Sequence, residues 1–271
     1  MEVVLKKILL FSGLIALGAV FLISGCSDKS TKDEISEGDY TNEDFLLARA
    51  EADSVMEDIR IDNFGARDWI CREPMGPLPP QIDSVIYDSL TGWHVWEFSR
   101  EDPVVQFSVI DSFRFTDLNS NYQQFRDSTT NVFERRLKKD FHAERGRIHN
   151  GTEWNRTLDR NTIWDGLADS VTTLNGDFNR YWSGESVWRD FEKTVDGEMT
   201  DILFHTDDLR PLRHAHPFDG TFEAWMVMDM ELPRRQAHIE SHLIVTFFDG
   251  GYHAYLGRGD NWWEWTHYWP E

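Results

Sequence analysis

The sequence predicts a mainly β fold, a strongly curved antiparallel sheet or barrel-like meander with one N-terminal amphipathic helix. Between residues 82 and 271, apolar residues recur at every second position over several stretches, which is the pattern of strands with one buried face. Asn-Gly and Asp-Gly dipeptides, which favour hairpin turns, occur among these stretches. A sheet of roughly ten or more strands must curl, close or split into two layers, so a two-layer β-sandwich is the alternative.

The N-terminal region, up to residue 44, predicts an export signal followed by a tether. Lys6 and Lys7 precede an uncharged apolar run that ends at Ser24, and this order is typical of a secretory signal peptide over residues 1–25. The next segment, 26–44, is acidic, since its residues 27–44 include seven acidic and two basic side chains. We expect a flexible tether there.

A short motif joins these two segments. Ile23-Ser24-Gly25-Cys26 resembles the lipobox of bacterial lipoproteins, in which an aliphatic and two small residues precede a cysteine that receives diacylglycerol. The resemblance implies that Cys26 becomes the first mature residue, carries acyl chains such as palmitate and anchors the chain to a membrane of the bacterial cell envelope. Ser27 favours the outer membrane, with the periplasmic or surface face left open. The alternative is an ordinary signal peptide or a short membrane-spanning helix with a chance cysteine.

A helix and a connector are expected between residues 45 and 81. Thr41 and Asp44 form a capping-box pattern, which marks a helix start. Apolar residues then recur at helical spacing and predict an amphipathic helix at about 42–60: Phe45, Ala48, Ala52, Val55, Met56 and Ile59. Prolines between residues 74 and 80 predict an extended connector. The β domain is expected over residues 82–271.

Within the β domain, the two-residue period is clearest at 105–115, 222–232 and 239–247. The segment 132–141 fits both a helix and a strand and is left open. Six dipeptides are candidate turns, and we expect most of them to join antiparallel neighbours: Asn150-Gly151, Asp165-Gly166, Asn175-Gly176, Asp196-Gly197, Asp219-Gly220 and Asp249-Gly250.

The net charge and the cysteine content exclude several classes of partner and site. The formal net charge is −21, so the chain should repel nucleic acid. With Cys26 lipidated, Cys71 is the one cysteine left, which excludes an internal disulfide, a Cys-ligated metal and a Cys-x-x-Cys redox pair. We expect no cofactor. His214 and His216 have a spacing that zinc sites use on strands, although flanking prolines favour a loop there.

The sequence favours a protein that is not an enzyme. It contains no Gly-x-Ser-x-Gly nucleophile elbow and no glycine-rich phosphate loop. Acidic residues are too numerous to single out a catalytic pair. We therefore assign no catalytic residue, and an envelope hydrolase is the third hypothesis.

Two stripes of side chains are the candidate ligand-binding residues: Met226, Met228 and Met230, and Trp263, Trp265 and Trp269. Flexible thioethers and aromatic rings suit a cavity for varied apolar ligands, and filling of the core is the competing interpretation of both stripes. We predict a lipid-anchored binding or carrier protein for a lipid or another apolar or amphipathic ligand. The alternative is a scaffold or adhesion lipoprotein that contacts an envelope protein through its outer surface.

Overall fold

The computed structural model describes residues 49–50, 85–101, 103–145, 152–185, 190–209, 216–232 and 235–269. The chain divides into two units, residues 1–32 and 33–271, and all the described residues belong to the second. The predicted signal peptide, tether and proline-rich connector lie outside the described residues. So do Cys26, Cys71, His214 and the predicted helix at 42–60, except for its residues 49 and 50.

From residue 85 onward, the described part of the chain consists of β-strands, one 3-10 helix, η2, and the turns and loops between them. Their bounds are β1 Val85–Tyr87, β2 His94–Glu101, β3 Val105–Asp117, β4 Tyr122–Gln123, β5 Thr130–Arg145, β6 Thr152–Asp165, β7 Val171–Glu185, β8 Asp190–His205, η2 Thr206–Leu209, β9 Asp219–Leu232, β10 Arg235–Phe248, β11 Gly251–Arg258 and β12 Asn261–Tyr268.

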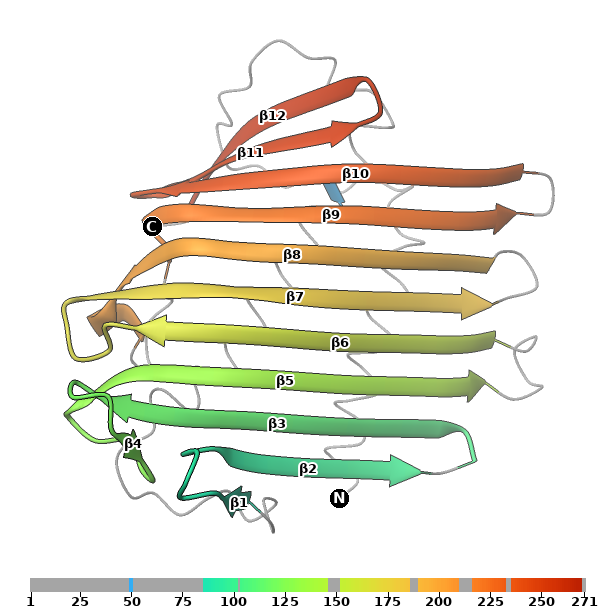
Figure 1. Cartoon of the computed structure of the whole chain (residues 1–271). Helices are drawn as coiled ribbons and strands as arrows, with labels where there is room; N and C mark the ends of the chain where they lie inside the picture. Colours follow the sequence, from blue (N-terminus) through green and yellow to red (C-terminus); the bar gives the residue numbers. More distant parts are fainter. Residues whose placement is uncertain are drawn as a thin grey trace. The chain divides into compact units, whose positions relative to one another are not determined.

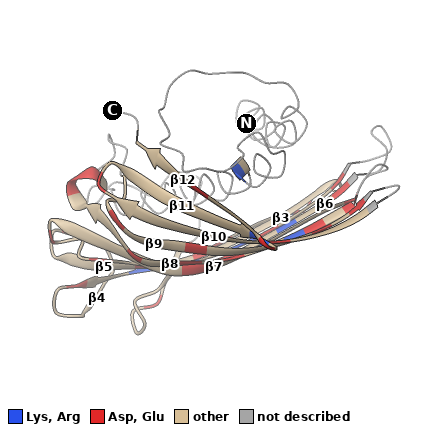
Figure 2. Cartoon of the chain, turned by 90° about the horizontal axis from the view of Figure 1, so that it is seen from above, with Lys and Arg blue, Asp and Glu red and all other residues tan. Residues whose placement is uncertain are grey.

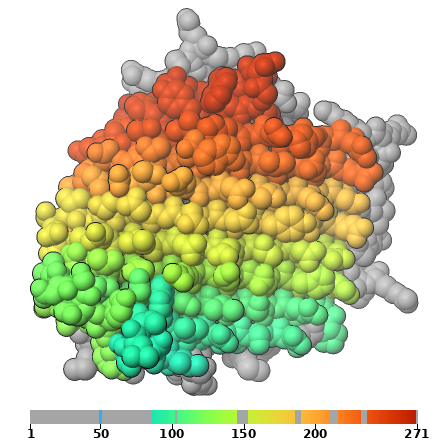
Figure 3. Space-filling view, viewed as in Figure 1, coloured from blue at the N-terminus to red at the C-terminus, as the bar shows by residue number. Residues whose placement is uncertain are grey.

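The twelve strands form one antiparallel sheet in which neighbours in sequence are neighbours in space. The order is β1-β2-β3-β5-β6-β7-β8-β9-β10-β11-β12, and β4 pairs with β3 outside this path. Figure 1 shows this meander, and in Figure 3 the same order gives successive bands of colour. β1 and β12 do not pair with each other, so the sheet is open, and Figure 2 shows it as a bowed layer. The predicted curved antiparallel meander is confirmed, with one sheet in place of a two-layer sandwich.

The strand segments predicted from the two-residue period are also confirmed. Residues 105–115 lie in β3, 222–232 in β9 and 239–247 in β10. The segment 132–141, which fits both a helix and a strand, lies in β5. Its alternation is that of the neighbouring strands, because directly paired residues share a face of the sheet.

One face of the sheet holds the core, and we call it the inner face. Its most buried large side chains come from β5 and from β7 to β11: Phe133, Leu174, Val195, Met199, Phe222, Leu243, Val245 and Leu256. This face also buries an ion pair, in which Nε and one Nη of Arg135 donate to the two carboxylate oxygens of Asp111 at 2.8 and 2.7 Å. The bidentate geometry offsets much of the cost of removing both charges from water.

The expectation that most Asn-Gly and Asp-Gly dipeptides join neighbouring strands is wrong. Asn150-Gly151 lies outside the described residues. Asp249-Gly250 is the turn between β10 and β11, and Gly166 begins the connection between β6 and β7, both glycines with positive φ. The other dipeptides lie within strands, at Asn175-Gly176 in β7, Asp196-Gly197 in β8 and Asp219-Gly220 in β9.

Close approach explains two of these strand glycines. A Cβ at Gly176 would lie 2.2 Å from the carbonyl oxygen of Asn161, and a Cβ at Gly197 would lie 2.4 Å from the ring of Phe178. The Phe178 ring occupies the space over Gly197 and reaches Phe222 on β9, with ring centroids 6.0 Å apart. These glycines are therefore packing positions on the inner face, because only a residue without a side chain fits there.

An extra residue in β8 changes which residues of that strand face the core. Pairing with β7 shifts between Leu174 and Gly176, which oppose Ile202 and Met199. Asp201 has a positive φ of 49° at this bulge, and its backbone N–H donates to Oδ1 of Asn175 at 2.7 Å. The bulge brings Met199 and Ile202, three residues apart, to the same face.

We expect Gly197→Ala to destabilise the domain by about 1–3 kcal/mol, because the new methyl group overlaps the Phe178 ring in a packed core. The free energy of unfolding from urea titration measures this. Phe178→Leu makes room for the methyl group, so the double variant should cost less than the sum of the single variants. Additive costs would show that the ring is not what excludes a side chain at residue 197.

Candidate functional site

The side chains of the inner face are more buried at one end of the strands than at the other. Where β3 ends and β5 begins, its side chains are buried, as at Phe115 and Phe133. Where β3 begins and β5 ends, inner-face side chains are mostly half-buried, as at Phe107 and Phe141. This half-buried end is our candidate site, because side chains there retain surface that a ligand can contact.

Two rows of directly paired residues make up the site. The central row crosses β3 and β5 to β10 through Phe107, Phe141, Arg156, Trp182, Lys193, Met228 and Ile239. The distal row, nearer the strand ends, runs through Val105, Ala143, Trp154, Gly184, Phe191, Met230 and Ala237. Antiparallel register thus places residues from seven strands side by side on one face.

Within the distal row, a glycine again makes room for a ring. A Cβ at Gly184 would lie 2.5 Å from the ring of Phe191. Phe191 in turn packs edge-on against Trp154, with ring centroids 5.6 Å apart. The two rings therefore form an apolar surface across β6 and β8 that passes over β7.

The ring of Trp182, at the middle of the central row, lies among three cations. The guanidinium carbons of Arg156 and Arg180 are 5.5 and 5.2 Å from the ring centroid, and Nζ of Lys193 is 5.5 Å from it. Aromatic faces attract cations, more strongly where water is excluded. Neither row contains an acidic residue, although the chain has a net charge of −21. This part of the inner face therefore combines apolar surface with positive charge.

The predicted methionine stripe divides between the core and the site. Met226 is 2% exposed and belongs to the core. Met228 lies in the central row and Met230 in the distal row, both half-buried. The structure thus brings the last two methionines together with the cationic and aromatic side chains of the site.

The predicted tryptophan stripe lies elsewhere on the inner face. Trp263 and Trp265 on β12 are paired with the inner-face residues Leu256 and Ala254, as the alternation predicted. Trp265 is fully enclosed, and Trp263 and Trp269 pack against the core. The central row ends at Ile239 on β10. Because β11 lies between β10 and β12 and pairs with β10 only from His242 onward, the tryptophan stripe is not part of the site.

A pocket adjoins the distal row at the ends of β6 to β10. Its volume is about 710 Å³, within the range of small-molecule sites, and Gly184, Phe191, Met230 and Ala237 are among its lining residues. Six carboxylates also line it: Glu153, Glu185, Asp190, Glu192, Asp229 and Glu231. An anionic group would be repelled by these carboxylates and attracted by the cations around Trp182.

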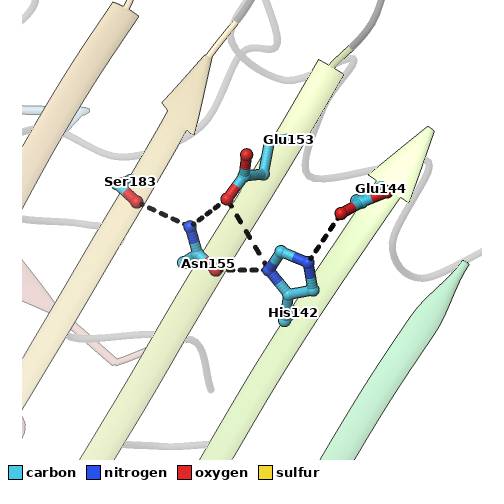
Figure 4. A network of polar contacts seen from close by, with 5 residues as sticks. All are labelled: His142, Glu144, Glu153, Asn155 and Ser183. Carbon is cyan, nitrogen blue, oxygen red and sulfur yellow. Dashed lines mark hydrogen bonds and ion pairs between the residues drawn. The ribbon is translucent and has the colours of Figure 1, made fainter. Parts of the chain in front are cut away.

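A polar network lies on β5, β6 and β7, on the outer face (Figure 4). Nδ1 of His142 is 2.6 Å from Oδ1 of Asn155, and Nδ2 of Asn155 donates to Glu153 at 3.2 Å and to Ser183 at 3.3 Å. The bond to Asn155, together with Glu144 and Glu153, raises the pKa of His142 above its ordinary value. Ser183 is bonded to Asn155 and not to His142 in this network, so it lacks the nucleophile–base contact that hydrolases use.

The histidines proposed as metal ligands have other contacts where they are described. The ring of His216 stacks on Trp269, with centroids 4.7 Å apart, and His214 lies outside the described residues. Within the described ranges, no three His, Cys, Asp or Glu side chains are grouped so that they could hold a metal ion.

Sequence analysis missed Arg156, Trp182 and Lys193. All three are inner-face residues. Arg156 and Lys193 interrupt the apolar alternation of β6 and β8, and Arg180 and Gly184 interrupt it on either side of Trp182 in β7, so these strands did not stand out from the sequence. The available signal was the repeated appearance of basic residues in an acidic chain. Their convergence depends on pairing across three strands, which the sequence does not reveal.

No protein-family model, curated protein or solved structure matches this chain. In the part of the chain that the structure describes, no helix has the length and apolar character needed to cross a membrane. Function is therefore inferred from the residues and their geometry alone.

We expect Asn155→Ala to lower the pKa of His142 towards its ordinary value of 6.5, because the variant removes the main hydrogen bond to the ring. Histidine Hε1 shifts in an NMR titration measure this, with His142→Gln used to assign the resonance. The raised pKa means that protonated His142 stabilises the wild-type fold below about pH 6.5, and that this contribution disappears as pH rises through the folded-state pKa.

Asn179→Ala is the matched control for this titration, since Asn179 donates to Asp196 on the neighbouring pair of strands. It should leave the pKa of His142 unchanged. An unchanged pKa in Asn155→Ala would instead assign the shift to the carboxylates of Glu144 and Glu153.

Proposed function

We propose that this chain is a lipid-anchored lipoprotein of the bacterial cell envelope that binds or carries an apolar or amphipathic ligand on its inner face. No chemical step is part of the proposal. The central and distal rows form the binding surface, and Cys26 carries the anchor.

The anchor is supported by the Ile23-Ser24-Gly25-Cys26 motif and by the apolar run before it. Two or more acyl chains give stable attachment, whereas one chain binds reversibly. Ser27 after the cysteine favours the outer membrane. The acidic segment at 27–44 has the composition of a tether between the membrane and the β domain.

The ligand-binding role is supported above all by the central row. Phe107 and Phe141 lie on one side of Trp182, and Met228 and Ile239 lie on the other beyond Lys193. Three cations converge on the Trp182 ring between these apolar side chains, and this combination favours a binding role. A ligand with an apolar chain and an anionic group, such as a fatty acid, fits both the apolar flanks and the cations around Trp182.

For the anchor, we expect Cys26→Ser to abolish incorporation of labelled palmitate when the chain is expressed in a bacterial host that processes lipoproteins. The thiol is the group that accepts the lipid, and a hydroxyl does not replace it in the thioether. Cys71→Ser is the matched control, because these are the two cysteines of the chain, and it should be labelled like the wild type. Labelling of Cys26→Ser at the wild-type level would contradict the anchor.

For the ligand, we expect native mass spectra of the chain from Ser27 onward to show an adduct with oleate that is lost on denaturation. Arg156→Gln/Lys193→Gln should weaken oleate binding about tenfold or more, since charge-assisted hydrogen bonds are worth roughly 1.5–3 kcal/mol each. Arg136→Gln is the matched control, because Arg136 also lies over a tryptophan, Trp93, at 4.6 Å, but not on the inner face.

The uncharged analogue oleyl alcohol separates the two parts of this proposal. Equal binding of oleate and oleyl alcohol would support an apolar binding site and contradict its preference for an anionic group. A bare mass with both compounds would contradict the carrier function and favour the scaffold hypothesis.

A further inference from the structure

An aromatic cluster lies on the outer face of β9 to β12, opposite the core. It consists of Trp225, His242 and Trp262, and we call it the outer cluster. Trp225 is paired with His242, His242 with Gly257, and Gly257 with Trp262, so the three side chains follow one line across the strands. The rings of Trp225 and His242 stack with centroids 5.0 Å apart and an interplanar angle of 11°, and Trp262 meets His242 edge-on at 6.3 Å.

The outer cluster is held in place and yet exposed. A Cβ at Gly257 would lie 2.8 Å from the ring of Trp262, so the glycine provides the space that this indole occupies. Nε2 of His242 is 2.6 Å from Oε1 of Glu223, which fixes the ring between the two tryptophans. Even so, Trp225 is 44% and Trp262 60% exposed. Two indoles of one cluster that keep this much exposed surface indicate an interaction site more than a single exposed apolar residue does.

Carboxylates surround the outer cluster. Glu223 on β9, Glu240 on β10 and Glu264 on β12 each stand two residues from a member of the cluster, and residues two apart on a strand share a face. Glu264 also accepts a hydrogen bond from Tyr255, which raises the pKa of that phenol. These groups are hydrogen-bond acceptors with negative charge, so the surface repels anions and attracts groups that donate and carry positive charge.

Another tryptophan of this chain already has such a cationic partner. The ring of Trp93 is covered by the guanidinium groups of Arg114 and Arg136, at 4.8 and 4.6 Å from the ring centroid. Among the described residues, no lysine or arginine lies over Trp225 or Trp262. The outer cluster provides exposed indole rings with carboxylates around them. A partner can supply the cation.

We propose that the outer cluster is a docking site for a partner protein that inserts a lysine- or arginine-bearing segment. The side-chain cation lies against the exposed indole surface, and Glu223 and Glu264 balance its charge. Tryptophan is the best aromatic partner for a cation, and complementary charge speeds encounter with a basic segment and disfavours acidic ones. The cluster and the rows of the inner face lie on opposite sides of the sheet, so this docking does not depend on the proposed ligand.

The test is a fluorescence anisotropy titration of a labelled oligo-arginine peptide with the full-length protein in neutral detergent. Trp225→Leu/Trp262→Leu should weaken binding about tenfold, because the variant removes both indoles that a cation can contact. This double variant keeps the charge of the chain, so binding that depends on net charge alone would not change. Circular dichroism and the thermal midpoint confirm that the variant is folded.

Two controls make the result specific. Ile163→Ala removes another exposed apolar side chain, 46% exposed, and should bind the peptide like the wild type. An oligo-citrulline peptide, which has the shape of oligo-arginine without its charge, should bind much more weakly. Equal affinity of the double variant and the wild type, or equal affinity for both peptides, would overturn the proposal. Binding of a neutral oligosaccharide such as cellotetraose in place of oligo-arginine would also overturn it and assign the cluster to glycans.

Discussion

The register between neighbouring strands is the constraint on which the rest of this structure depends. In an open sheet whose strands follow one another in sequence, a slip of one residue between two strands would move every later side chain to the other face. The bulge in β8 shows how the chain keeps apolar side chains on the inner face. Thr200 and Asp201 add a residue against β7, and the insertion keeps Ile202 and Phe204 in the core. Without the bulge, both side chains would face outward and the core would lose two buried apolar groups.

The same alternation separates charge as well as apolar surface. The inner face carries the basic residues Arg156, Arg180 and Lys193, in or next to the central row. Glu223 and Glu264 lie on the outer face, as do most acidic residues of the strands. Long basic side chains can bury their alkyl stems along apolar surface, and their charged ends can lie against aromatic rings. Short carboxylates have no such stem and need either water or a bidentate partner, as Asp111 has in Arg135. A chain with a net charge of −21 can therefore keep a cationic patch on one side of a single sheet.

The sequence was most informative where the period of two was uninterrupted. It predicted β3, β9 and β10 and the inward direction of Trp263 and Trp265, because apolar residues occupy each second position there. The sequence was misleading at Gly176 and Gly197. An Asn-Gly or Asp-Gly dipeptide looks the same in the sequence whether its glycine forms a turn or leaves room in a strand for a neighbouring carbonyl or ring. The site around Trp182 could not be predicted, because its cations come from β6, β7 and β8 and meet only through the register. The lipobox motif remains a prediction, as Cys26 lies outside the described residues.

A sheet one layer thick places the two proposed surfaces close together without joining them. Trp225 and Met226 are consecutive in β9 but face opposite sides, and the same holds for Trp262 and Trp263 in β12. The side chain of Trp225 can therefore be changed while the inner-face contacts of Met226 stay in place. Communication between the two surfaces would need a shift of backbone register, which the bulge and the glycine contacts oppose, or a change in sheet curvature. The geometry therefore favours two surfaces that act independently.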